Sequence, residues 1–406
     1  MRIQLWSYNF APEPIGIGPV SATWAREMAD RGHEVEVVAA HPHYPSPRWG
    51  TRLLPYREVR SGVPVLRLPI WVGRDSTRER LRQEASFAAA QFAALPILKR
   101  ADVVVSVSPC FFALGPAMVN VAARRIPWVL WLQDLLPDAA AKTGLLADGF
   151  MLDAARRYER AAYRAAREIV LISESHRRSL IDKGVPAEKL HVITNPTTLS
   201  ARAQTVEPAP AAVAPRVLNM GNIGLSQGLA ELVRAFEASE EMGRRGVEFR
   251  FAGDGVEVPA LKREIFSDRV KVLGVIPDTI SEELERATIG LVSQLPQTGE
   301  FNMPSRLMNF MGHGIPVLAV VGPSSEVARV VRESGGGWVI DASDPNDFPK
   351  AVAEILDQPA ERIDRGRAAR EYADEHFSPA ATAAAFEAVL ESAVGDTLAE
   401  TVKRSL

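Results

Sequence analysis

The sequence predicts an α/β protein built from two Rossmann-like, doubly wound domains. Short runs of Val, Ile and Leu alternate with longer segments of helical periodicity, as in buried parallel sheets whose strands are joined by helices. This alternation occurs in the first half of the 406-residue chain and again in the second half. Between the halves lies an Ala- and Pro-rich stretch of low charge, which has the composition of a linker.

The first domain is predicted over residues 1–200. Its first apolar run, "RIQLWSY", precedes a helical segment in which Val20, Trp24 and Met28 share one face and Gly32 marks the end. Further runs continue the alternation: "EVEVVAAH", "VPVLRLP", "ADVVVSVSP", "PWVLWLQD" and "EIVLISES". Turn residues bound each run, which predicts a parallel sheet with helices on both faces.

The second domain is predicted over residues 217–378, after a linker at 201–216. Its expected strands are "RVLNMGNIG", "VEFRFAGDG", "VKVLGVI", "IGLVSQL", "PVLAVV" and "GGWVI". The Ser378-Pro379 step breaks the helical tail, and we expect the final helix, 379–406, to pack back on the first domain. Because doubly wound folds bind ligands at the carboxyl ends of their strands, we expect the two domains to face each other across a cleft.

Composition and charge narrow the class of protein. Cys110 is the single cysteine, so no internal disulfide can form, and no Cys/His cluster has metal-ligand spacing. The sequence shows neither a secretory signal nor a run of about 18 apolar residues, and we expect a cytoplasmic protein. Residues 1–200 carry a net charge of +7 and residues 201–406 carry −10. This asymmetry indicates an anionic partner for the first half, or alternatively drift in surface composition.

A glycine-rich loop, "NFAPEPIGIGPVSATW", follows the first strand. Gly16, Ile17 and Gly18 lead into a helix, where backbone amides and the helix dipole favour an anion such as a phosphate or an anionic acceptor. Ser21 occupies the place of the third glycine of the dinucleotide fingerprint, so a nicotinamide cofactor is not supported. The alternative is a loop that merely connects strand and helix.

The second half has a corresponding turn, "NMGNIGLSQGL". Gly221, Asn222 and Gly224 follow its first strand, and Gly253 follows the next strand in "FAGDG". The turns at these strand ends together indicate a nucleotide pocket, although each alone is a weak signal.

The stretch "EFNMPSRLMNFMGHGIPV" combines an acid, a helix start and an arginine. A helix is expected to begin at Pro304 and Ser305, with its free amides directed at a ligand. Arg306 adds a forked cation suited to a diphosphate. Glu300 is placed to accept hydrogen bonds from sugar hydroxyls, and Asn309 is one turn further on, where it can bind a ribose hydroxyl. The alternative is a surface acid, a capped helix and an exposed arginine.

These segments together resemble the GT-B glycosyltransferases of the retaining family 4, and within them the WbuB-like transferases of bacterial surface-polysaccharide assembly. The matching segments are "GIGPVSATWAREMADRGHEVEVV", "DLLPD", "VITNP", "GNIGLSQGL", "FAGDG", "LGVIPD" and "PSRLMNFMGHGIPVLA". The resemblance implies that the C-terminal domain binds a nucleotide sugar, usually a UDP-sugar, and that the N-terminal domain binds a polysaccharide or lipid-linked saccharide acceptor. It implies no further cofactor and no metal, and the sequence has no Asp-x-Asp motif.

The resemblance also assigns roles within the donor site. The base would lie against Val275 and Ile276. The diphosphate would meet the 221–224 turn, Arg306 and the amides that begin at Met303, and Glu300 would hold the donor sugar. Two positions depart from the family: Gln227 stands where a lysine or arginine commonly grips the diphosphate, and Asn309 stands where many members have a glutamate.

Asp134 ends the run "PWVLWLQD", where the family often has a polar residue close to the reacting sugar. We expect it to orient the acceptor hydroxyl or to stabilise positive charge that develops at the sugar carbon. The alternative is an N-cap for the helix that follows. His41 and His43, after the second strand, are weaker candidates for contact with the acceptor.

A membrane is the other expected partner. The segment 73–100 begins with basic residues and ends with apolar ones, and a following helix carries Arg156, Arg160, Arg164 and Arg167. We expect these segments to contact the inner, anionic face of the cell membrane; the alternative is a solvated helix face. No nucleic-acid partner is expected. Two other functions share this architecture: a UDP-sugar 2-epimerase and a noncatalytic sugar-binding protein.

Overall fold

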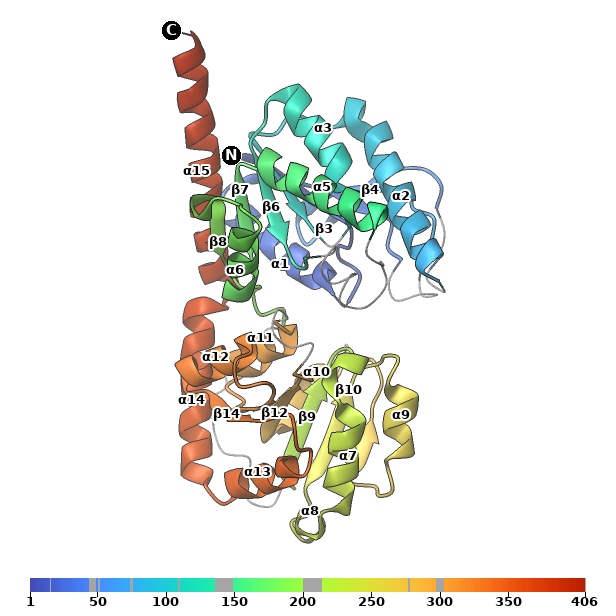
Figure 1. The fold of residues 1–406 in the computed structure, drawn as a ribbon, viewed down its shortest axis with the longest axis vertical. Coiled ribbons are helices and arrows are strands. Elements are labelled where there is room, and N and C mark those ends of the chain that lie inside the picture. Colours follow the sequence, from blue (N-terminus) through green and yellow to red (C-terminus); the bar gives the residue numbers. More distant parts are fainter. Residues whose placement is uncertain are drawn as a thin grey trace. The chain divides into compact units, whose positions relative to one another are not determined.

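The computed structural model of the protein describes residues 1–14, 16–43, 49, 52–73, 76–108, 110–135, 149–199, 214–276, 278–296 and 303–405. Its contacts divide the chain into two compact units. The first unit consists of Met1–Thr194 together with Thr382–Leu406, and the second of Asn195–Ala381. Each unit contains one sheet covered by helices (Figure 1).

The first unit contains an eight-stranded sheet of order β3-β4-β2-β1-β5-β6-β7-β8. The strands are β1 (Arg2–Ser7), β2 (Glu34–Ala40), β3 (Tyr56–Arg60), β4 (Val63–Leu68), β5 (Val103–Val107), β6 (Trp128–Leu132), β7 (Glu168–Leu171) and β8 (Leu190–Val192). All neighbours pair in parallel except β3, which is antiparallel to β4 at the edge. Because β1 lies between β2 and β5, the strand order reverses there, which makes it the topological switch point of this sheet.

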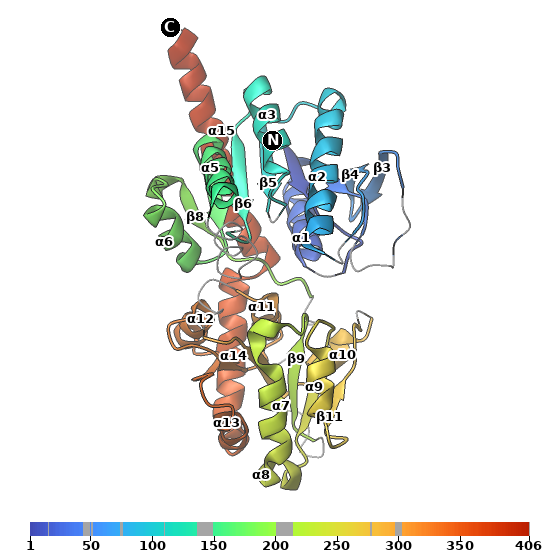
Figure 2. The ribbon, with the colours of Figure 1, turned by 45° about the vertical axis from the view of Figure 1, so that its right-hand side comes forward.

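Helices cover both faces of this sheet. They are α1 (Ile17–Asp30), α2 (Thr77–Ala94), α3 (Leu114–Arg124), α5 (Phe150–Ala165), α6 (Glu174–Asp182) and α15 (Pro379–Ser405), with the short 3-10 helices Leu95–Ile97 and Ala187–Lys189. On one face, α1 and α15 bury Trp24 and Phe386 against the strands. On the other face, α2, α3 and α5 bury Phe87, Leu114 and Tyr163. Figure 2 shows α15, in red, running beside this sheet.

The second unit has a six-stranded, all-parallel sheet of order β11-β10-β9-β12-β13-β14. Its strands are β9 (Arg216–Met220), β10 (Glu248–Ala252), β11 (Val270–Val272), β12 (Ile289–Ser293), β13 (Val317–Val320) and β14 (Gly337–Ile340). Its helices are α7 (Leu229–Ala238), α8 (Glu240–Arg244), α9 (Val258–Arg263), α10 (Ile280–Arg286), α11 (Ser305–Gly312), α12 (Glu326–Ser334), α13 (Asp347–Leu356) and α14 (Pro359–His376), with a 3-10 turn at Leu225–Gln227. Phenylalanines from β10, α7 and α13 form the centre of one core.

The predicted α/β fold class, with two doubly wound sheets, is confirmed. Every predicted strand is present, and two were missed. Strand β3 reads "YREVR", which lacks an apolar run because it forms an edge, and β8 has three residues. The break at Ser378-Pro379 is present between α14 and α15.

The unit boundaries differ from the predicted domains in two places. Residues 195–199 belong to the second unit, although the prediction placed them in the first domain. Arg216 was assigned to the linker but is the first residue of β9; most of that linker, 201–213, lies outside the described residues. From Thr382 onward the final helix belongs to the first unit. Among the described residues, no helix has both the length and the apolarity to cross a membrane.

Candidate functional site

The candidate site lies at the switch point of the second sheet. Strand β9 pairs with β10 on one side and with β12 on the other, so connections leave it in opposite directions. All strands of this sheet are parallel, and the loops after β9 and β12 therefore emerge at the same, carboxyl edge. This is where doubly wound folds bind ligands.

Helix α11 begins at this edge. Pro304 is its N-cap, in an extended conformation, and no side chain caps the first turn. The amide of Leu307 donates to the Pro304 carbonyl (3.0 Å), so the first-turn amides without an intrahelical acceptor are those of Ser305 and Arg306. The helix is anchored by its apolar face, since Leu307, Met308, Phe310 and Met311 are fully buried. The Phe310 ring lies directly over Gly290 of β12, where an added Cβ would come within 2.6 Å of the ring. This packing fixes the start of the helix beside β12, where Met303 is buried and Ser305 is exposed.

Arg306, in the first turn of α11, points toward the end of β9 and the turn that follows it rather than into solvent. Its Nη1 donates to Asn219 Oδ1 (3.0 Å) and to Gln227 Oε1 (2.9 Å), and its Nη2 donates to the carbonyl of Asn222 (2.8 Å). The side chain is 7% exposed, and burial lowers its pKa to about 10, so it remains a cation at neutral pH. The predicted alternative of an exposed arginine is therefore wrong.

Two amide side chains hold Arg306. Asn219 is fully buried in β9 and its Nδ2 donates to the carbonyl of Leu291 in β12 (3.4 Å). The Nε2 of Gln227 donates to the Asn222 carbonyl (2.7 Å), and the Gln227 carbonyl accepts from the Ser293 hydroxyl (2.5 Å). Gln227 thus binds the cation of Arg306 directly. Asn219 was not predicted as a site residue. The feature that could have indicated it is a polar side chain inside an otherwise apolar strand.

The predicted turn after β9 is shaped by glycines. Gly221 adopts a φ of 91°, and its amide donates to the carbonyl of Ala252 at the end of β10. An added Cβ at Gly253 would lie 1.8 Å from the Gly221 carbonyl oxygen, so Gly253 is required for the two turns to lie side by side. A Cβ added at Gly224 would lie 2.7 Å from the side-chain nitrogen of Asn222. The structure therefore gives Gly253 a packing role.

The residues predicted to contact the base also lie at this edge, after β11. Val275 is 43% exposed and Ile276 is half-buried, so both offer an apolar surface. The amide of Leu273 donates to the carbonyl of Phe251, which keeps this turn next to the turn after β10.

The side chain of Asn309, a predicted ligand of the donor, bonds to another segment of the chain. The amide of Asn309 faces the chain itself: its Oδ1 accepts from the backbone amides of Thr198 and Leu199 (3.0 and 3.3 Å), and its Nδ2 donates to the Thr198 hydroxyl (3.4 Å). Asn309 is 3% exposed, so a ribose contact would require these bonds to break, and its role is to fasten the 197–199 segment. Glu300 lies outside the described residues.

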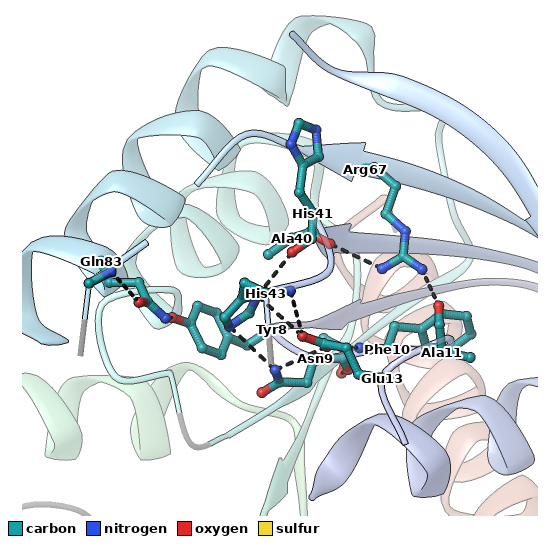
Figure 3. A network of polar contacts seen from close by, with 12 residues as sticks. Tyr8, Asn9, Phe10, Ala11, Glu13, Ala40, His41, His43, Arg67 and Gln83 are labelled. Carbon is teal, nitrogen blue, oxygen red and sulfur yellow. Dashed lines mark hydrogen bonds and ion pairs between the residues drawn. The ribbon is translucent and has the colours of Figure 1, made fainter. Parts of the chain in front are cut away.

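The corresponding edge of the first unit contains a buried carboxylate. Glu13 Oε2 accepts from Asn9 Nδ2 (3.0 Å) and the amide of Phe10 (3.2 Å), and its Oε1 accepts from the amide of His43 (2.9 Å). Figure 3 shows Glu13 between the loop after β1 and the loop after β2, with His43 beside the Tyr8 ring. His43 Nδ1 lies 2.9 Å from the His41 carbonyl and 3.4 Å from Glu13 Oε1; because both are acceptors, Nδ1 carries a hydrogen.

This network supports the predicted loop of Gly16, Ile17 and Gly18. Gly16 caps α1 with a φ of 70°, no side chain caps that helix, and Gly18 packs on the Glu13 carbonyl. His41 and His43, predicted to touch the acceptor, are both buried, and burial lowers the pKa of His41. Glu13 was missed by sequence reasoning; its signal was a lone acid in a proline-rich apolar loop.

Asp134 follows β6 in the first unit, as predicted. Its side chain is exposed, yet the surrounding protein desolvates the carboxyl enough to raise its pKa. The preceding residue, Gln133, is held through its amide by the Ser108 hydroxyl (2.9 Å). Residues 136–148, where a helix capped by Asp134 would lie, are outside the described residues. Within the part of the chain that the structure describes, no three His, Cys, Asp or Glu residues are grouped as metal ligands.

Both halves of the chain match known protein families. Residues 16–196 match the family described as glycosyl transferase 4-like domain, and residues 214–358 match glycosyl transferases group 1. The chain is 27% identical to the putative colanic acid biosynthesis glycosyl transferase WcaI of Escherichia coli K12 over 357 residues, 82% of this chain and 85% of that protein. It is 26% identical to the probable glycosyltransferase WbjE of Pseudomonas aeruginosa over 279 residues, 64% of this chain and 66% of that protein.

The fold is also that of a solved glycosyltransferase-like structure. HepE of Anabaena, in complex with UDP, superposes with a TM-score of 0.67 at 16% identity, covering 97% of this chain and all of HepE. The two family matches together span about four fifths of the chain, one over most of each unit, and their order is that of the resemblance found in the sequence. The chain belongs to the GT-B glycosyltransferases of the family 4 type.

Proposed function

We propose that the protein is a retaining glycosyltransferase that moves a hexosyl or N-acetylhexosaminyl group from a UDP-sugar to a polysaccharide or lipid-linked saccharide. The observation that carries the donor site is the buried guanidinium of Arg306 at the switch point, beside the uncapped start of α11. A forked cation and free helix amides are the groups that bind a diphosphate. UDP is the nucleotide that we propose because HepE, which shares the fold, has been solved in complex with UDP.

The same groups suit the chemistry of transfer. As the bond between sugar and diphosphate breaks, negative charge grows on the leaving diphosphate, and Arg306 with the first amides of α11 would stabilise it. In a retaining transfer on one face of the sugar, this diphosphate takes the proton of the acceptor hydroxyl. Asp134 would orient that hydroxyl, and Glu300 would hold the donor sugar.

The donor site is tested by calorimetry with UDP. We expect Arg306→Ala to weaken UDP binding by about 100-fold, because it removes charge-assisted hydrogen bonds to the diphosphate. Arg250→Ala is the matched control: Arg250 is also buried in the second unit but pairs with Glu248 (2.8 Å). That control should lower stability without changing the affinity for UDP. An unchanged affinity in Arg306→Ala would refute the placement of the diphosphate.

The reaction class is tested by product analysis. A transferase converts a UDP-sugar only when an acceptor is present, whereas a 2-epimerase converts it without one and a binding protein converts nothing. We expect acceptor-dependent release of UDP, unaffected by a metal chelator. Asp134→Asn should lower kcat while the affinity for UDP stays unchanged, because Asp134 belongs to the acceptor-binding unit.

We further propose that the acceptor is reached at an anionic membrane. The face of the first unit formed by α2 and α5 exposes apolar and basic residues together. Phe150 and Met151, at the start of α5, are 81% and 66% exposed. Exposed arginines follow on the same helix and on α2: Arg157, Arg160, Arg164, Arg78, Arg80 and Arg82. Of the predicted row, Arg156 is half-buried and Arg167 lies beyond the end of α5.

Co-sedimentation with liposomes tests this surface. We expect binding to phosphatidylglycerol vesicles at low salt, with each basic residue adding about 1 kcal/mol, and none to phosphatidylcholine vesicles. Phe150→Ser combined with Met151→Ser should weaken binding, and so should Arg157→Gln with Arg160→Gln. Equal recovery of the wild type with both kinds of vesicle would contradict an electrostatic membrane contact.

A further inference from the structure

Arg306 differs from every other buried arginine in the described part of the chain. Four arginines there are less than a tenth exposed, namely Arg67, Arg216, Arg250 and Arg306. Three of them have a carboxylate partner: Arg67 pairs with Glu58 (2.8 Å), Arg216 with Glu283 (2.7 Å), and Arg250 with Glu248 (2.8 Å). Arg306 has none among the described residues, and its three hydrogen-bond acceptors are all amide oxygens.

An unpaired buried cation is costly, and folded proteins normally pair such a charge with an acid. Three neutral acceptors bind three of the five N–H groups of Arg306 without cancelling its charge. A carboxylate in the same place would do both, and would leave less attraction for an external anion.

We propose that Asn219 and Gln227 are positioning residues that hold Arg306 in an amide cage, whose neutrality reserves the guanidinium charge for the diphosphate of the donor. The amide cage consists of the side-chain oxygens of Asn219 and Gln227 and the carbonyl of Asn222. This inference rests on the proposed donor site. It identifies the residues that leave the charge of Arg306 available to the donor diphosphate.

The NH₂ groups of Asn219 and Gln227 fix the orientation of both side-chain amides. Asn219 Nδ2 donates across to β12, and Gln227 Nε2 donates to the Asn222 carbonyl, so the oxygen of each must face Arg306. The two side chains come from the strand and the turn of the switch point, and the guanidinium comes from α11. The amide cage therefore joins three segments around one charge.

The test replaces an amide by a carboxylate of the same shape. Asn219→Asp keeps the acceptor for Arg306 but adds a negative charge, and Gln227→Glu does the same from the other side. We expect each to weaken UDP binding at least tenfold, roughly the effect of losing one charge-assisted bond, while uridine binding is unchanged. The melting temperature without ligand should change little, because the buried cation gains a charged partner while the hydrogen bond from Nδ2 or Nε2 to a backbone carbonyl is lost.

A control separates cancelled charge from simple repulsion. Asn222→Asp places a carboxylate in the same turn, but the Asn222 side chain is exposed and it is the backbone carbonyl that contacts Arg306. We expect a smaller loss of UDP affinity and a similarly small change in melting temperature. Equal losses in Asn222→Asp and Asn219→Asp would overturn the amide cage, as would unchanged UDP affinity in both Asn219→Asp and Gln227→Glu.

The outcome is distinguishable from failure of the donor site itself. If Arg306→Ala leaves UDP affinity unchanged, the diphosphate does not bind there. If Arg306→Ala weakens binding but the carboxylate variants do not, the donor site stands and the proposal about the neutral amides is wrong. A parallel loss of uridine binding would indicate structural damage and would also count against it.

Discussion

The two units place opposite charges at the switch points of their sheets. In the first unit, the carboxylate of Glu13 follows β1 and accepts hydrogen bonds from the chain's own N–H groups. In the second, the guanidinium of Arg306 lies beside β9 and donates to the chain's own oxygens. Two of the donors to Glu13 are backbone amides of different loops, so this acid fastens two loops together, whereas the acceptors of Arg306 lie at the edge proposed to bind the donor.

The comparison shows that burial of a charge does not by itself mark a ligand site. What matters is whether the surrounding groups use the charge to hold the fold or leave it for a ligand. Glu13 is 2% exposed and Arg306 is 7% exposed, and this small difference does not separate the two roles. The partners do.

The largest expected effect concerns the close approach of the turns in the second unit. In Gly253→Ala the new Cβ would meet the Gly221 carbonyl at 1.8 Å, so the turn that contains the amide cage must move. We expect a loss of more than about 4 kcal/mol in the free energy of unfolding, together with loss of UDP binding. Denaturant unfolding followed by calorimetry measures both.

Gly18→Ala is the matched change in the first unit. There the added Cβ would lie 3.0 Å from the Glu13 carbonyl, a contact that a shift of a few tenths of an ångström relieves. Gly18 lies in the first turn of α1, where alanine also favours the helix, so the net change should stay within about 1 kcal/mol. A similar collapse of both variants would mean that the two switch points are equally tight.

A smaller effect is expected at Glu13. Glu13→Gln keeps the shape but removes the charge and presents an NH₂ group to donors. We expect the free energy of unfolding to fall by about 1.5–3 kcal/mol, the usual worth of a hydrogen bond to a charged group. UDP affinity should be unchanged, because the residue lies in the other unit. Weaker UDP binding with unchanged stability would reverse the roles assigned to the two charges.

The smallest effect on stability is expected at Glu387 of α15, a partly exposed carboxylate that lies outside the proposed donor site. It accepts from His33 Nε2 (2.7 Å) and from Arg31 (2.9 Å), both at the end of α1, and these contacts lower its pKa. A lowered acid pKa stabilises the fold above the ordinary value of 4.5, and the contribution is lost as the pH falls through the folded value. Glu387→Gln should therefore cost about 0.5–1 kcal/mol at pH 7 and nothing in strong acid, as measured by thermal unfolding. A difference in stability between the wild type and Glu387→Gln that grows as the pH falls would contradict this expectation.

Much of the fold could be predicted because its strands are apolar runs bounded by turns. Strand β3 could not be predicted in this way, because it is an edge strand whose side chains are mostly exposed and therefore show no apolar pattern. At the site, Arg306 was predicted from its place at the start of a helix, which is a local signal. The partners of Arg306 come from residues 219–227, far away in the sequence, and only the pairing of β9 with β12 brings them together. The partners of Asn309 could not be predicted for the same reason, since Thr198 and Leu199 come from a distant segment.

The return of α15 to the first sheet has a consequence for how the chain is made. Phe386 packs against Trp24 and Trp131, with ring centres 5.1 and 5.0 Å apart, and these partners emerge from the ribosome long before it does. The second unit, 195–381, is complete in sequence before Phe386 has been synthesised. The first unit therefore cannot complete its core around Trp24 and Trp131 until α15 has been synthesised. The second unit, whose sequence lies between the two parts of the first, can fold before then.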